Sequence, residues 1–79
     1  MITIRYFARF RELTGKEQEV LPITSMTVQE LQDWVKQTYA EFADYGGAVL
    51  IALNEEYARP EDIIQSGDVV AFIPPVSGG

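Results

Sequence analysis

One amphipathic segment, residues 27–42 with the sequence TVQELQDWVKQTYAEF, constrains the fold of this 79-residue chain more than any other feature. Its apolar side chains recur every three or four residues, which places them on one stripe of an α-helix. The stripe consists of Val28, Leu31, Trp34, Val35, Tyr39 and Phe42. Thr27 and Glu30 have the spacing of a capping box at the start of a helix. The pattern predicts one main helix over residues 27–43, with a single face buried in a core.

Three further segments have the apolar patterns of β-strands. Residues 1–7 (MITIRYF) alternate, residues 48–53 (AVLIAL) form a continuous apolar run, and residues 69–73 (VVAFI) form the last strand. This composition predicts an α+β domain in which a mixed sheet carries the main helix on one face. Both terminal strands are apolar, so we expect them to lie side by side and parallel in the middle of the sheet.

The remaining segments give weaker signals. Residues 17–23 (EQEVLPI) are a strand candidate, and Pro22 favours an edge position because proline cannot donate a hydrogen bond to a neighbouring strand. Residues 8–15 are typical of a short helical turn that ends at Gly15. Residues 59–68 are interpreted as an irregular loop.

The terminal strands carry apolar residues in both parities, although one helix covers only one face of a sheet. Phe7, Val69, Ala71 and Ile73 fall on the parity opposite the one expected to meet the helix. Contiguous apolar residues on an open face indicate a protein partner. The alternative is that loops of the same chain cover this face.

Composition excludes several classes of function. The chain has no Cys and no His, which removes the usual zinc ligands and the nucleophile–histidine pairs of hydrolases, so we do not expect an enzyme that acts alone. A net charge of −6 argues against nucleic acid and anionic membranes as partners. The charge is unevenly distributed along the chain, because residues 1–16 hold four Lys or Arg side chains and only one acidic side chain. No apolar run approaches the length of a membrane span and no signal peptide is evident, so we expect a cytoplasmic protein.

The last six residues, PPVSGG at positions 74–79, have a composition that a folded core does not need. We expect a globular domain over residues 1–73 and a flexible tail over residues 74–79. Two prolines stiffen the base of the tail, and two glycines without side chains can enter a narrow channel. The carboxylate of Gly79 becomes reactive once ATP converts it to an acyl-adenylate, which requires the tail to reach another enzyme's active site.

Four stretches together resemble one family across essentially the whole chain. FARFRELTG (7–15), TVQEL (27–31), LNEEY (53–57) and SGDVVAFIPPVSGG (66–79) are similar to the small subunit of molybdopterin synthase, a ubiquitin-like sulfur carrier. The resemblance implies a ubiquitin-like β-grasp fold. The ending FIPPVSGG is the most specific part of the match. Family members often carry an acid directly after the GD turn, where this chain has Val69.

The resemblance also implies a mechanism and partners. An adenylyltransferase that uses ATP would activate Gly79, and a sulfur donor would convert it to a thiocarboxylate. The tail, residues Pro75, Val76, Ser77, Gly78 and Gly79, would then enter the large synthase subunit, in a heterotetramer with two copies of each subunit, and deliver sulfur to a cyclic pyranopterin precursor. No cofactor would stay bound to the chain itself. We expect the large subunit to contact the apolar open face, with Arg11 and Tyr57 at its margin.

Three alternatives stay open. A sulfur carrier for the thiazole of thiamine has the same fold and the same Gly-Gly ending. A ubiquitin-like protein modifier would join Gly79 to a lysine of a target protein. An interaction module with an inert tail is a further possibility. The fate of the activated carbonyl separates these functions.

Overall fold

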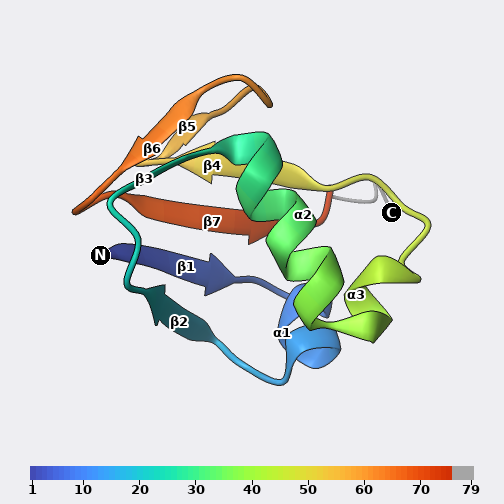
Figure 1. Ribbon diagram of the computed structural model, residues 1–79. Coiled ribbons are helices and arrows are strands. Elements are labelled where there is room, and N and C mark those ends of the chain that lie inside the picture. The colour runs from blue at the N-terminus through green and yellow to red at the C-terminus, as the bar shows by residue number, and fades with distance from the viewer. Residues whose placement is uncertain (76–79) are drawn as a thin grey trace.

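The structure, a computed structural model, describes residues 1–75 and is built on a mixed sheet of five strands. The strands lie in the order β2-β1-β7-β4-β5 (Figure 1). Their bounds are β1 Ile2–Tyr6, β2 Gln18–Leu21, β4 Leu50–Leu53, β5 Glu56–Tyr57 and β7 Val69–Ile73. The terminal strands β1 and β7 pair in parallel, with Arg5 opposite Ala71, and the other neighbours pair antiparallel. The predicted arrangement of the terminal strands is thus confirmed, as is the edge position of the second strand, which ends at Leu21, before Pro22.

The main helix is shorter than predicted. Helix α2 covers Val28–Thr38 and begins with the expected capping box, in which Thr27 and Glu30 each accept a hydrogen bond from the other's backbone N–H. The expected continuation to residue 43 is wrong: Tyr39 is extended (φ −119°, ψ 103°), and a separate helix α3 covers Ala40–Ala43. Packing explains the break, because the Tyr39 hydroxyl donates to Glu19 at 2.6 Å while Phe42 turns into the core. Tertiary contacts here override helical periodicity.

A second sheet was not predicted. Strands β3 (Ser25–Thr27) and β6 (Ile63–Gln65) pair antiparallel, with Met26 opposite Ile64; β6 lies within residues 59–68, which were expected to be an irregular loop. Ile64 is fully buried, so this small sheet closes one end of the core. A strand of three residues is too short to show a period in the sequence, which explains the error.

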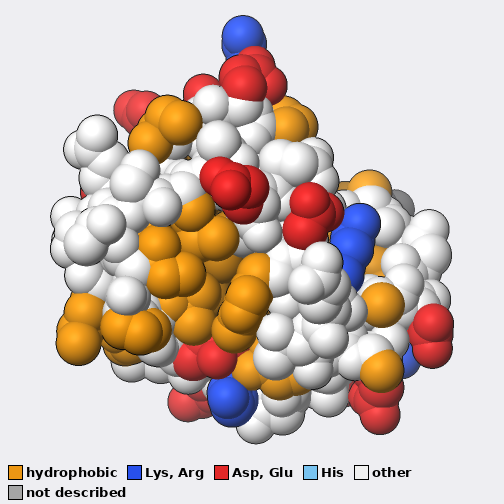
Figure 2. Space-filling model, viewed as in Figure 1, with side chains coloured by type: hydrophobic (Ala, Val, Ile, Leu, Met, Phe, Trp, Pro, Cys, Tyr) orange, Lys and Arg blue, Asp and Glu red, His pale blue; other side chains and the backbone are white. Residues whose placement is uncertain are grey.

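The core lies between the five-stranded sheet and the helices. Ile2, Ile4 and Tyr6 of β1 are buried, as are Val70 and Phe72 of β7, so the predicted parity of both strands is confirmed. Helix α2 crosses this face, while α3 and helix α1 (Arg9–Thr14) sit together at one end of the sheet (Figure 1). In the same view, apolar side chains gather between α2 and the connection from β2 to β3 (Figure 2).

Gly15 ends α1 in the left-handed conformation (φ 74°), as its place after the helical turn predicted. Its N–H donates to the carbonyl of Arg11 at 2.8 Å. Because the turn closes here, the chain reverses directly into β2 at the edge of the sheet.

Candidate functional site

The face of the sheet opposite the helices carries an open hollow of about 760 Å³. Five of the six residues predicted for a partner surface line it: Phe7, Tyr57, Val69, Ala71 and Ile73. Tyr57 is 77 % exposed and Val69 is 39 % exposed, so the loops of residues 1–75 do not cover this face. Their role in binding a partner stays a prediction.

Small side chains in the middle of the sheet produce the hollow. Ala71 of β7 lies opposite Ala52 of β4, and both line the hollow. Val69 and Ile73 stand two residues to either side of Ala71 on the same face, and both are longer. The alanines therefore form a low floor between higher walls, a shape that accepts a protruding apolar group.

The hollow also contains residues that were not assigned to it from the sequence: Arg5, Ala52, Asn54 and Glu55. Arg5 shares the parity of Phe7, so the alternation of the first strand carried the signal for it. Asn54 and Glu55 both have positive φ (50° and 72°) in the β4–β5 turn, and no sequence period indicates which way such a turn points.

A hydrogen-bonded clamp fixes this turn against the start of β7. The Asn54 amide donates to the Asp68 carboxylate at 3.1 Å, and the Val69 N–H donates to Asn54 Oδ1 at 3.0 Å. The Asp68 carboxylate also accepts a hydrogen bond from the backbone N–H of Gln65. The hydrogen bond from Gln65, and to a smaller extent the one from the Asn54 side chain, lower the pKa of Asp68. The β4–β5 turn is thereby tied to the wall that Val69 forms.

Two guanidinium groups flank the Phe7 ring. Arg5 lies 5.1 Å and Arg11 5.8 Å from the ring centroid, distances typical of cation–π contacts. Arg11 does not line the hollow; its Nε donates to the Tyr6 carbonyl at 3.1 Å, and its guanidinium lies 3.7 Å from Glu17. The predicted margin residue is thus held next to Phe7, at the edge of the site.

The basic N-terminal segment is largely neutralised by its own neighbours. Arg9 pairs with Glu12 at 2.6 Å, and Lys16 approaches Glu19 at 3.4 Å. Together with the pair of Arg11, this leaves Arg5 as the Lys or Arg side chain of residues 1–16 without a carboxylate partner in the described part of the chain.

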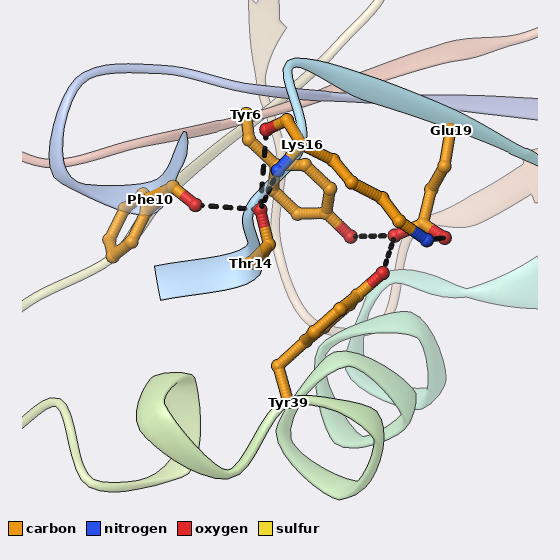
Figure 3. A network of polar contacts seen from close by, with 6 residues as sticks. All are labelled: Tyr6, Phe10, Thr14, Lys16, Glu19 and Tyr39. Carbon is orange, nitrogen blue, oxygen red and sulfur yellow. Dashed lines mark hydrogen bonds and ion pairs between the residues drawn. The ribbon is translucent and has the colours of Figure 1, made fainter. Parts of the chain in front are cut away.

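The most strongly perturbed titratable groups form a separate network (Figure 3). Tyr6 and Tyr39 both donate to Glu19 Oε2 at 2.6 Å. Burial of the Glu19 carboxyl alone would raise its pKa, but the hydrogen bonds from Tyr39 and Tyr6, together with the charge and hydrogen bond of Lys16, outweigh burial and lower the pKa. Burial, and then the contact with Glu19, raises the pKa of both tyrosines. A carboxylate held by two phenols is a poor general base, so this network joins β1, β2 and the α2–α3 break rather than performing chemistry.

The chain leaves the sheet at the rim of the hollow. Ile73 is the last residue of β7 and is followed by Pro74 and Pro75, which lack the N–H that a further ladder would need. The tail residues Val76, Ser77, Gly78 and Gly79 lie outside the described residues. Within residues 1–75, no helix is long and apolar enough to cross a lipid bilayer.

These features define a class: a β-grasp domain of the ubiquitin-like type, with a mixed sheet, parallel central terminal strands and one main helix on one face. Residues 4–79 match the ThiS family, and the chain belongs to that family. The chain is 39 % identical over 79 residues to the molybdopterin synthase sulfur carrier subunit of Arabidopsis thaliana, covering 99 % of this chain and 82 % of the relative.

Solved structures agree with this assignment. A protein described as molybdopterin converting factor, subunit 1, from Pyrococcus furiosus superposes with a TM-score of 0.82 at 32 % identity, covering 95 % of this chain and 97 % of the other. Subunit 1 in a complex of subunits 1 and 2 of molybdopterin-converting factor from Helicobacter pylori gives a TM-score of 0.71 at 24 % identity, covering 99 % and 97 %. The second likeness supports the fold alone.

Proposed function

We propose that this chain is the sulfur-carrier subunit of a molybdopterin synthase. The observation that carries the proposal is the similarity over nearly the whole chain to relatives that bear this name, at 31–39 % identity. The direct passage of β7 into PPVSGG supports it, because the central strand presents the tail on a rigid base.

The chemistry takes place at the C-terminus. An activating enzyme joins the Gly79 carboxylate to the α-phosphate of ATP, and pyrophosphate leaves. A sulfur nucleophile from a donor then attacks the acyl-adenylate carbonyl, and AMP departs with the bonding electrons. With a persulfide as the donor, the product of this attack is an acyl disulfide; a thiol then cleaves its S–S bond, which leaves a disulfide on the donor side and a thiocarboxylate on Gly79, in which sulfur replaces one carboxylate oxygen. The chain's own contribution is a slim terminus and a stable body, since neither Cys nor His is available to act as a nucleophile.

The thiocarboxylate serves a large synthase subunit. That subunit binds the open face, receives residues 75–79 and holds the cyclic pyranopterin precursor. A dithiolene contains two sulfur atoms, so two thiocarboxylated carriers are used for each product. A heterotetramer with two copies of each subunit matches this requirement. We place the activity in the cytoplasm, where ATP is available to the activating enzyme.

Deletion of Gly79 tests the proposal. The truncated tail ends about 3.6 Å short of its target, and a displacement of about 1 Å can already cost a hundredfold in rate. We expect folding to be unchanged, because terminal residues bury little, and thiocarboxylate formation to be lost. A chain extended by one residue is the matched control for length, and it should fail as well.

Two measurements decide the outcome. ATP–pyrophosphate exchange with the cognate activating enzyme reports adenylation, and intact-mass analysis reports the replacement of oxygen by sulfur. Thiolation of the truncated chain at the full-length rate would refute the terminus as the site. Sulfur delivered to a thiazole would identify a thiamine carrier, and an isopeptide bond to a protein lysine would identify a modifier.

A further inference from the structure

The hollow on the open face carries a positive side chain on one side and a negative side chain on the other. Arg5 enters it from β1, and Glu55 enters it from the β4–β5 turn. Strands β7 and β4 lie between β1 and β5, so the two charges sit on opposite sides of an apolar floor. Both residues are exposed, and neither has an ion-pair partner among residues 1–75.

Arg5 is prepared to bind a carboxylate. Its guanidinium rests 5.1 Å from the centroid of the Phe7 ring, which restricts the side chain before any partner arrives. Restriction in advance lowers the entropy lost on binding. A planar guanidinium donates two parallel hydrogen bonds to a carboxylate from its edge, so a contact of its face with Phe7 leaves these N–H groups available.

Glu55 is held in place by its backbone. It follows Asn54 in a turn with two positive φ angles, and the Asn54 side chain is bonded to both Asp68 and the Val69 N–H. The backbone from which the Glu55 carboxylate projects therefore stands at a fixed position relative to β7. A basic group of a partner could pair with Glu55 without competition from a cation in the described part of the chain.

We infer that the polarity of the hollow selects and orients the large subunit. The surface of that subunit that fills the hollow is apolar, with an acidic residue that meets Arg5 and a basic residue that meets Glu55. This inference rests on the proposed function for the identity of the partner. Ile73 lines the hollow and the tail starts at Pro74, so the hollow adjoins the base of the tail that the large subunit receives. Paired charges on both sides of the floor fix the angle at which the tail enters.

Charge reversal tests the inference. The variants are Arg5→Glu, Glu55→Arg and the double variant, which keeps the wild-type net charge of −6 because the two reversals cancel. Lys36→Glu is the matched control, since Lys36 is an exposed cation on α2, on the other face of the sheet. Affinity for the cognate large subunit is measured by titration calorimetry at low salt and at about 0.5 M salt, where charges are screened within a few ångström.

Each single reversal should weaken binding about tenfold at low salt, because one attraction becomes a like-charge repulsion, and the loss should shrink at high salt. The double variant should stay weak, because its polarity is inverted. Lys36→Glu should bind like wild type. Circular dichroism checks that every variant folds.

Two outcomes would overturn the inference. Wild-type affinity in both single variants would show that the charges do not face the partner. Recovery of wild-type affinity in the double variant would show that only net charge matters. Failure of the wild-type chain to bind the large subunit would instead refute the proposed function, and the inference with it.

Discussion

Removal of the Glu19 carboxylate should destabilise the fold far more than its place on an edge strand suggests. Glu19 lies on β2, and its side chain is only 13 % exposed. One of its oxygens accepts hydrogen bonds from Tyr6, which is 1 % exposed, and from Tyr39. The variant Glu19→Ala leaves the Tyr6 hydroxyl without this acceptor inside the core.

The expected loss follows from these contacts. A buried donor without a partner costs about 1–3 kcal/mol, and a hydrogen bond to a charged group contributes about 1.5–3 kcal/mol. Tyr39 is only partly buried, and water can replace its acceptor at lower cost. We therefore expect Glu19→Ala to lower the free energy of unfolding by about 3 kcal/mol, which lowers Tm by about 15 °C in a domain of this size.

Thermal and urea unfolding monitored by circular dichroism measure this loss. Glu17→Ala is the control, because Glu17 is 82 % exposed and its pair with Arg11 is long; it should cost less than about 0.5 kcal/mol. In a Tyr6→Phe/Tyr39→Phe background, Glu19→Ala should become nearly neutral, since no hydroxyl is left without an acceptor. An equal loss in both backgrounds would refute the argument.

Three further predictions follow from other contacts. Ile73→Asp should abolish co-elution with the large subunit while leaving the fold intact, because it places an unpaired charge in the interface, and Ile73 is only half-buried in the free chain; unchanged co-elution would contradict the predicted surface. The lowered pKa of Glu19 means that its contribution to stability is present above its ordinary value of 4.5 and is lost as the pH falls through the lowered pKa. Urea midpoints measured down to pH 3 should therefore fall less steeply for Glu19→Gln than for wild type. Gly67→Ala should cost about 1 kcal/mol in thermal unfolding, because φ is 96° there, whereas Gly46→Ala, at a site without positive φ, should cost less.

Patterns of period two and capping signals predicted most of the fold. Alternation placed Ile2, Ile4 and Tyr6 in the core and left Phe7 on the open face, because a strand has no other way to distribute successive side chains. The same rule, applied to the whole strand, would also have placed Arg5 at the site. The parity of Phe7, Val69, Ala71 and Ile73 depends only on the sequence, so the sequence sufficed to predict their place on the open face.

Features that depend on tertiary contacts could not be predicted in this way. Tyr39 fits the helical stripe, yet it lies outside the helix because its hydroxyl donates a hydrogen bond to Glu19, which is twenty residues away in the sequence. Strand β6 has three residues, and only its pairing with β3 makes it a strand. The direction of Glu55 depends on a turn with positive φ that is held by Asp68 from another loop.

The parallel pairing of β1 and β7 connects the fold to the function. Two parallel strands end at the same edge of the sheet, so the end of β1 lies beside the point where the tail leaves. The hydrogen bond from the Phe7 N–H to the Phe72 carbonyl, at 3.1 Å, fixes this neighbourhood. An antiparallel pairing would place the start of β1 there and would separate Phe7 and Arg11 from the tail. The topology therefore brings the apolar face, its flanking guanidinium groups and the base of the tail into one continuous surface, although their residues lie at opposite ends of the sequence.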